Sequence, residues 1–376
     1  ASALLAYLHD EPGGQLSARA RPRPNPTPSP SLARRGRHPH LAGMSQLSLF
    51  DDEPTQPAAT AAGAPPGAPT VTAAPPSSEL AVLARGLPSG LRLGTSSWSF
   101  PGWAGLVYGG PAPAAVLSRD GLRAYARHPL LTTVGVDSGF YAPLDADRLA
   151  RWAAQVPVDF RFLVKAPAAV TQRHQRGGDG RWRHNPEFLS PDIALRQAVE
   201  PYRRGLGERA GVLLLQFPPQ GGRTHPRRFA EDLYRFLKRL PPGPVYAVEL
   251  RDTHLLTADF AAALHHGGAV PSLAAHPRLP PLSAQASLLQ DAAQGPLVLR
   301  WLLRRNRGYE EARERYGPFR QLAEPDPDTR AAICALAAAA LARGREVFVI
   351  VNNKAEGSSP LSIAALARTL ADVHPA

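Results

Sequence analysis

Charged side chains stand at the ends of several short β-type runs in the sequence. Glu249 closes an apolar run, Lys165 ends an alternating run, and Arg300 lies late in a third run. A carboxylate at the end of a buried strand is partly desolvated, so its pKa could suit general acid or base catalysis. Lys165 and Arg300 could clamp a phosphate or carboxylate and stabilise phosphoryl transfer. We therefore predict that Glu249 and Lys165 are catalytic and that Arg300 binds substrate.

The same residues also have a structural interpretation. Glu249 could form an ion pair with Arg251, Arg300 or Lys165, and Lys165 could neutralise Glu249 or Asp137. Both interpretations place these side chains in one pocket.

Amide and aromatic residues complete the predicted site. Gln216, Asn352 and Asn353 could orient a ligand or tie loops to strand ends. Trp98 and Tyr141 could stack on a base or sugar, or could instead pack with other loop side chains and cover the barrel. The predicted substrate-binding residues are Arg300, Arg251, Gln216, Asn352, Asn353, Asp137, Tyr141 and Trp98.

The runs that carry these residues recur through the chain, and each is followed by helix-like sequence. This alternation predicts an α/β fold, a (β/α)₈ or TIM barrel, in which chemistry sits at the carboxyl ends of the strands. We place the barrel domain at residues 89–376. The eight runs are 91–95, 131–136, 158–165, 211–217, 244–250, 269–275, 297–303 and 345–352.

Residues 1–88 have a different composition. They hold 15 of the 41 prolines, many of them alternating with small or polar residues. Such a segment buries too little apolar area to offset its conformational entropy. We therefore predict a disordered Pro/Ala-rich leader that ends near residue 88.

The leader contains one short motif. Gln46, Leu47, Ser48, Leu49 and Phe50 read QLSLF, which resembles the pentapeptide by which many bacterial replication and repair proteins dock on the DNA sliding clamp. A short extended segment of this kind supplies a hydrogen-bonding Gln and an apolar pair for a pocket, and the flanking chain acts as a tether. The alternatives are a chance apolar cluster or a segment that packs back onto the barrel.

Charge favours a polyanionic partner such as DNA. The net charge is +12, and the leader holds seven arginines against six acidic residues, so almost all of the excess lies in the barrel. A solvated basic surface is the alternative, since 40 arginines against three lysines also fit a GC-rich genome. In one basic Gly-containing loop, His174 and His184 flank several arginines and Trp182. This loop would suit a nucleic-acid backbone, or it could simply extend into solvent.

Other classes of protein lose support. The single cysteine, Cys334, lies among alanines and leucines, as a core thiol does. No apolar stretch reaches the ~18 residues that span a membrane, and the first residues do not read as a signal peptide, so we expect a cytoplasmic protein. We find no metal-ligand array, Walker loop, G-x-G-x-x-G or G-x-S-x-G motif, and thus no identifiable cofactor.

Taken in order, the strand-end segments resemble the YecE-like family, also called domain of unknown function 72. The resemblance runs from about Leu91 to Leu370 and implies a TIM barrel without an established reaction. The segments that carry it are LRLGTSSWSF (91–100) with Trp103 and Tyr108, FY (140–141), FRFLVK (160–165), LQFPP (215–219), VELR (248–251) and NN (352–353).

The chain departs from the common pattern of this family at three places. Gly135 stands where the family has Glu, Thr171-Gln172 replaces Thr-His, and Arg300-Trp301-Leu302-Leu303 replaces Arg-x-His-Gly. A mechanism that depends on that Glu or those His residues is therefore in doubt for this chain.

Three functions remain open from the sequence. The first is a possible hydrolase that acts on or near DNA, cleaves a phosphoester or glycosidic bond, and is tethered to the sliding clamp. The second is a barrel enzyme that acts on a small phosphorylated or sugar-like metabolite. The third is a non-catalytic DNA-binding or adaptor protein, because a barrel alone fixes no reaction.

Overall fold

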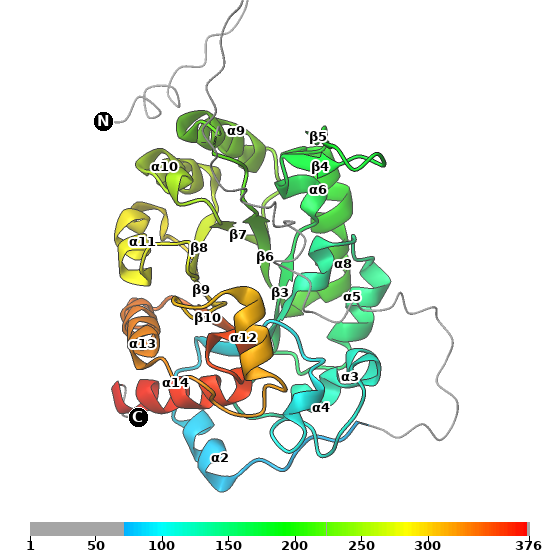
Figure 1. Cartoon of the computed structure of the whole chain (residues 1–376), viewed down its shortest axis with the longest axis vertical. Coiled ribbons are helices and arrows are strands. Elements are labelled where there is room, and N and C mark those ends of the chain that lie inside the picture. Colours follow the sequence, from blue (N-terminus) through cyan, green and yellow to red (C-terminus); the bar gives the residue numbers. More distant parts are fainter. Residues whose placement is uncertain (1–70, 223, 374–376) are drawn as a thin grey trace, which may run out of the picture. The chain divides into compact units, whose positions relative to one another are not determined.

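The computed structural model describes residues 71–222 and 224–373. Its eight-stranded parallel sheet closes into a barrel in the order β1-β10-β9-β8-β7-β6-β3-β2 (Figure 1). The predicted TIM barrel is confirmed. The barrel strands are β1 (Leu91–Thr95), β2 (Thr133–Val136), β3 (Arg161–Lys165), β6 (Ala210–Phe217), β7 (Val245–Leu250), β8 (Val270–Ala275), β9 (Leu297–Trp301) and β10 (Val347–Val351).

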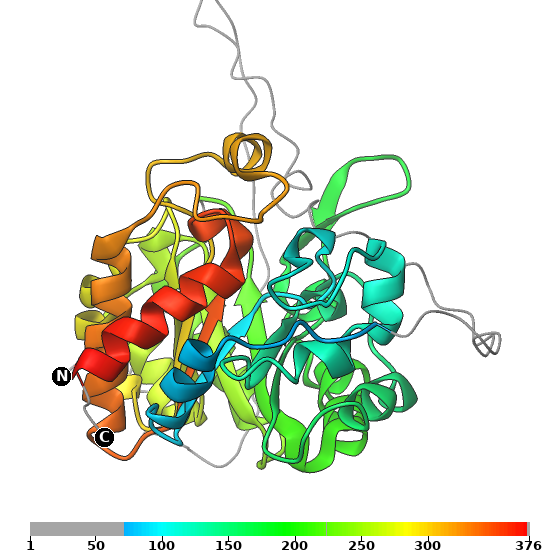
Figure 2. The same ribbon diagram turned by 90° about the horizontal axis from the view of Figure 1, so that it is seen from below.

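Helices surround the barrel and follow its strands (Figures 1 and 2). They are α2 (Ser78–Arg85), α3 (Ala114–Asp120), α4 (Leu122–Tyr125), α5 (Ala146–Ala153), α6 (Ala168–Thr171), α7 (Pro191–Ala194), α8 (Glu200–Leu206), α9 (Pro226–Lys238), α10 (Ala258–Gly267), α11 (Leu282–Leu288), α12 (Tyr309–Tyr316), α13 (Pro327–Leu341) and α14 (Ser359–Val373). No helix in these described ranges is long and apolar enough to cross a membrane.

The strands are buried on both faces, as expected for a parallel sheet covered by helices. Outward-facing side chains such as Leu213 and Leu215 pack with the helices, whereas Val212 and Leu214 join a separate cluster inside the barrel. This alternation decides which residues of each strand point toward the barrel axis.

Local sequence signals set the ends of the helices. Asp145 caps α5 by accepting a hydrogen bond from the Arg148 backbone N–H at 2.6 Å, and Thr257 caps α10 in the same way. Gly268 ends α10 in the left-handed conformation, with φ of 75°. These caps fix where each helix turns back toward the next strand.

Residues 71–88, which the sequence assigned to the disordered leader, are ordered in the structure. Ser78–Arg85 forms helix α2, capped by Ser77, and Glu79 pairs with Arg368 of α14 at 2.8 Å. Upstream, the Ala74 N–H donates to the Val107 carbonyl. Apolar side chains at 80, 83 and 87 pack against the core. This apolar burial offsets the conformational entropy that the sequence was expected to leave unbalanced.

A two-stranded hairpin interrupts the chain between β3 and α7. It consists of β4 (His174–Arg176) and β5 (Trp182–His184), and all six residues are exposed. Figure 2 shows the hairpin and α12 projecting from the same end of the barrel. The sequence predicted only a basic loop here, because three-residue exposed strands carry no hydrophobic alternation.

Candidate functional site

Inward-facing side chains change from apolar to polar at the carboxyl ends of the strands. The inner cluster includes Leu163, Leu214, Ala247, Val298 and Ile350. Two residues further along a strand, the side chain points the same way. That next position, within each strand or directly after it, gives one polar residue for every strand: Ser96, Asp137, Lys165, Gln216, Glu249, Ser272, Arg300 and Asn352.

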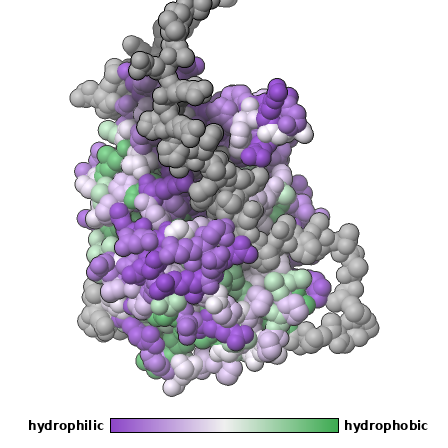
Figure 3. Space-filling model, in the orientation of Figure 1, coloured by the Kyte–Doolittle hydropathy of each residue, from purple (hydrophilic) through white to green (hydrophobic). Residues whose placement is uncertain are grey.

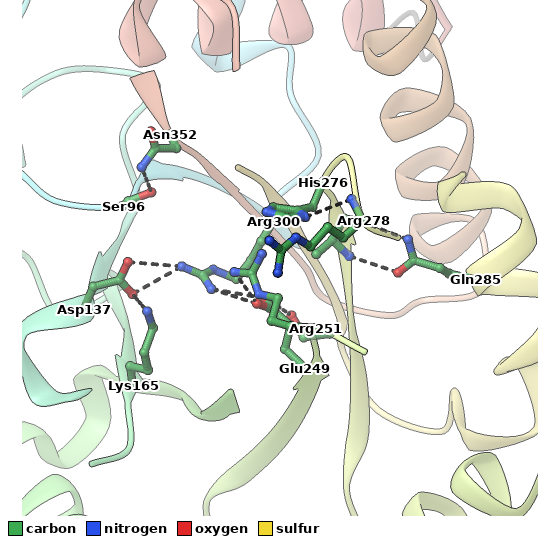
Figure 4. A network of polar contacts seen from close by, with 12 residues as sticks. Ser96, Asp137, Lys165, Glu249, Arg251, His276, Arg278, Gln285, Arg300 and Asn352 are labelled. Carbon is green, nitrogen blue, oxygen red and sulfur yellow. Dashed lines mark hydrogen bonds and ion pairs between the residues drawn. The ribbon is translucent and has the colours of Figure 1, made fainter. Parts of the chain in front are cut away.

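Glu249 is the centre of this polar layer. The carboxylate is fully buried (0 % exposed). Its Oε1 forms an ion pair with Arg251 Nη2 at 2.8 Å, and its Oε2 forms one with Arg300 Nη1 at 3.1 Å. Ser272 Oγ lies 3.4 Å from Oε2. Burial alone would raise the pKa of the Glu249 carboxyl, but the charges of Arg251 and Arg300 outweigh it and hold the pKa below its ordinary value. Glu249 is therefore an ionised partner of two guanidiniums (Figure 4).

Asp137 forms the second carboxylate of the layer. Lys165 Nζ lies 3.0 Å from its Oδ1, and Arg300 Nη2 lies 3.2 Å from both of its oxygens. Burial opposes ionisation of Asp137, yet Lys165 and Arg300 lower its pKa. Burial lowers the pKa of Lys165, and the nearby Asp137 opposes that shift. Lys165 Nζ also lies 5.3 Å from the centre of the Phe140 ring.

His276 also belongs to the site, although the sequence did not predict it as a site residue. Its Nδ1 accepts the backbone N–H of Arg278 at 3.2 Å, which leaves the ring proton on Nε2. Burial, with the Arg251 charge second, lowers the pKa of His276 to about 3. The imidazole is thus a neutral Nε2–H donor at pH 7. Its place directly after β8 was the available sequence signal.

The amide residues divide between two roles. Gln216 is fully buried on β6, and neither of its side-chain polar atoms has a hydrogen-bond partner among the described residues. Asn352 Nδ2 donates to Ser96 Oγ at 3.3 Å, while its Oδ1 accepts the Lys354 backbone N–H. Gln216 is therefore the amide that the site leaves available for a ligand.

Two predicted substrate-binding residues serve the fold instead. Asn353 Oδ1 accepts from Trp103 Nε1 at 3.2 Å and from the Ser359 N–H and hydroxyl at 2.9 Å, which ties the last loop to the start of α14. Trp98 is buried edge-on against Trp152 and donates Nε1–H to the Leu117 carbonyl. Asn353 lies one residue off the inward-facing phase of Asn352, whereas Trp98 lies beyond the end of β1 at Thr95, where strand alternation no longer sets the side-chain direction.

Tyr141 remains accessible. It follows β2 and is 52 % exposed, and its ring lies edge-on to Phe140. The predicted clamp-binding residues 46–50 lie outside the described residues. Within the described ranges, no three His, Cys, Asp or Glu side chains gather as a metal-ion site would require.

Comparison with known proteins places this arrangement in a family. The family model "Protein of unknown function DUF72" matches residues 92–376. The chain belongs to the DUF72 family. Two curated relatives are UPF0759 protein YecE of Escherichia coli, 29 % identical over 42 % of this chain and 47 % of the relative, and UPF0759 protein YunF of Bacillus subtilis, 31 % identical over 28 % and 35 %. The matches thus span less than half of each relative.

Two solved DUF72 structures share the fold. A DUF72 family protein from Enterococcus faecalis aligns with a TM-score of 0.51 at 20 % identity, over 76 % of this chain and 96 % of that one. One from Thermotoga maritima gives 0.51 at 19 % identity, over 75 % and 98 %. At identities of 20 % and 19 %, this similarity shows only that the proteins share the barrel fold.

Gly135 marks where this DUF72 barrel departs from the pattern given above. A Cβ on Gly135 would lie 3.2 Å from Ser96 Cα and 3.4 Å from Ile350 Cγ2. Those contacts are tight, so a larger side chain requires its neighbours to move. The strand-end layer therefore has Asp137 and Glu249 as its carboxylates, with Arg300 between them.

Proposed function

We propose that this DUF72 protein binds a phosphate group at the carboxyl ends of its strands and hydrolyses a phosphoester bond of a nucleic-acid substrate. The observation that carries the proposal is the imbalance of buried charge at the mouth. Three basic side chains, Lys165, Arg251 and Arg300, converge there against two carboxylates. Buried charge is costly unless it is balanced, so an anionic group would complete the set.

The protonation states favour phosphoester over glycosidic hydrolysis. Glycosidases commonly need a carboxylic acid with a raised pKa to protonate the leaving group. Here the pKa values of both Glu249 and Asp137 are lowered by neighbouring cations. Phosphoryl transfer depends instead on positioning and on stabilising negative charge, which guanidinium groups supply.

Each residue then has a distinct role. Arg251 and Arg300 hold the phosphate oxygens, and His276 Nε2–H donates a further hydrogen bond. Asp137 is ionised and retains some exposure, so it accepts the proton of the attacking water. Glu249 positions the two guanidiniums, and Gln216 orients the ligand. The ester bond breaks as the water oxygen bonds to phosphorus, and solvent protonates the leaving oxygen.

The test is turnover of three substrates: a single-stranded oligonucleotide, a small phosphomonoester and an aryl glycoside. We expect cleavage of the oligonucleotide, and a loss of about 100-fold or more for Arg251→Gln and Asp137→Asn. Arg343→Gln removes the same charge from an exposed site on the C-terminal side of α13 and should retain activity. Cleavage of the phosphomonoester alone would favour a metabolite enzyme. Turnover of the glycoside alone, or of nothing, would overturn the proposal.

We also propose that residues 46–50 tether the protein to a bacterial sliding clamp. Support comes from the five matching residues and from the acidic residues Asp51, Asp52 and Glu53 that follow them. A tether of this kind raises the effective concentration on DNA without demanding tight binding by the barrel. Binding of purified clamp by the intact chain tests it, and an adaptor role would show such binding without turnover.

A further inference from the structure

The β4–β5 hairpin presents aromatic rings and cations on one face. Its register pairs Arg176 with Trp182 and His174 with His184. Because alternate residues of a strand share a face, these four side chains lie on one side of the hairpin, and Gln175 and Arg183 lie on the other. The Arg176 guanidinium lies 5.4 Å from the centre of the Trp182 ring, and the two imidazoles are 6.3 Å apart.

Trp182 is exceptional among the tryptophans of the chain. It is 46 % exposed, whereas the other four are at most 6 % exposed. The hairpin is positively charged, because Arg176 and Arg181 are exposed and the one acidic residue of 174–184, Asp179, already pairs with Arg183 at 2.8 Å. Figure 3 shows hydrophilic surface gathered over this hairpin and over α12.

Buried amides hold the base of the hairpin in place. Asn185 Nδ2 donates to the carbonyls of Ala169 and Gln172, both at 2.8 Å. Gln220 accepts the Arg173 backbone N–H at 3.1 Å and donates to the Thr171 carbonyl. An exposed hairpin of this length gains little from its own burial, so these anchors stabilise it. The aromatic face is therefore held in a defined position before any partner binds.

We infer that this face of the hairpin, His174, Arg176, Trp182 and His184, binds single-stranded nucleic acid by base stacking. Exposed aromatic rings among cations are the elements with which proteins hold single strands without reading their sequence. Duplex DNA keeps its bases stacked internally and offers only its backbone to such a surface. The hairpin begins nine residues after Lys165, the last residue of β3. It projects from the same end of the barrel as α12 (Figure 2).

This inference rests on the proposed function and specifies its substrate. A strand stacked on the hairpin would lie at the end of the barrel from which the hairpin projects, and we propose that it continues from there to the mouth. The hairpin thus accounts for a nucleic-acid substrate, whereas the mouth accounts for the phosphate chemistry.

Tryptophan fluorescence of the full chain tests the inference. An oligothymidylate of about 12 nucleotides, within the range that single binding modules cover, should quench the emission of Trp182 in low salt. Trp182→Ala should weaken binding, measured by anisotropy of a labelled strand, by roughly 5- to 100-fold. Trp182→Phe should keep most of the affinity and lose the quenching. Arg343→Gln is the charge control to Arg176→Gln, and only the latter should weaken binding more than twofold.

Three results would overturn the inference. They are absence of binding in low salt, equal affinity of the Trp182→Ala variant, and a preference for duplex over single strand. The proposed function fails separately. If Arg251→Gln abolishes cleavage while the Trp182→Ala variant binds normally, the mouth chemistry stands and the hairpin assignment falls. If the hairpin binds single strands and the chain cleaves no phosphoester, the hairpin assignment stands and the proposed mouth chemistry falls.

Discussion

The Arg300 guanidinium reaches Asp137, which directly follows β2, a strand that is not a neighbour of β9. Nη2 of Arg300 lies 3.2 Å from each Asp137 oxygen, although β10 and β1 separate β9 from β2 in the barrel. Nη1 of the same group donates to Glu249. One buried cation therefore links two carboxylates across the mouth, and a change at any of the three alters the electrostatics of the other two.

Glu249→Gln should lower the free energy of unfolding by about 3 kcal/mol, because it leaves two buried guanidiniums without their shared counter-charge. Urea denaturation at pH 7 measures this change. Glu231→Gln, in the α9 pair with Arg227, is the matched control and should cost less than about 0.5 kcal/mol. Equal stability of the two variants would mean that Glu249 is not held as an ionised partner.

Two histidines should make the protein less stable as the pH falls from 6.5. Burial lowers the pKa of His276 to about 3 and that of His128 to about 4. The unfolded imidazoles titrate near 6.5, so below that pH the unfolded chain binds more protons than the folded one. Each histidine then contributes a loss of at most about 1.4 kcal/mol per pH unit.

Urea denaturation at pH 7, 6 and 5 checks this prediction. Glu249 and Asp137 have lowered pKa values, so their stabilisation is present above about pH 4 and is lost only below it. The slope between pH 6.5 and 5 therefore reports the histidines. His276→Gln and His128→Gln should each make it shallower, and an unchanged slope in both variants would contradict the low pKa values.

Hydrophobic patterning in the sequence was enough to predict the barrel and the end of the barrel at which its polar residues lie. The eight predicted runs end within two residues of the observed strand ends, because a buried strand requires a continuous apolar stretch. Glu249, Lys165 and Arg300 consequently appeared at the correct end of the barrel. The direction of side chains that follow a strand end was harder to predict, because the chain leaves the strand geometry there, and for that reason Asn353 and Trp98 were predicted to line the mouth.

Pairing between distant strands could not be read from the sequence. The choice between a catalytic and an ion-paired Glu249 depends on whether Arg251 and Arg300 reach it, and that is a property of side-chain geometry across the barrel. Helix α2 and the hairpin were missed for a different reason. Their stability comes from tertiary contacts, Glu79 with Arg368 and Asn185 with two carbonyls, rather than from local pattern.

Helix α2 should stabilise the barrel. A chain that begins at residue 86 lacks the Glu79–Arg368 pair and the packing of Leu80 and Leu83 on the core, whereas one that begins at residue 71 keeps them. We expect the shorter chain to unfold at a lower urea concentration, by roughly 1–3 kcal/mol for two partly buried leucines. Identical midpoints would restore the boundary that composition alone predicted.

The pentapeptide at residues 46–50 should bind the sliding clamp independently of the barrel. Two apolar side chains, Leu49 and Phe50, would anchor it, and ordering a flexible segment offsets part of the contact energy. We therefore expect micromolar affinity, on the order of −8 kcal/mol. Calorimetric titration of purified clamp with the intact chain measures it.

Replacing Leu49 and Phe50 by Ala should abolish that binding and leave the urea midpoint of the barrel unchanged. Arg251→Gln provides the converse control, because it should leave clamp binding intact while it removes turnover. If clamp is not bound at high micromolar concentration, the tether is excluded, and nucleic-acid recognition would then depend on the β4–β5 hairpin and the strand-end cations alone.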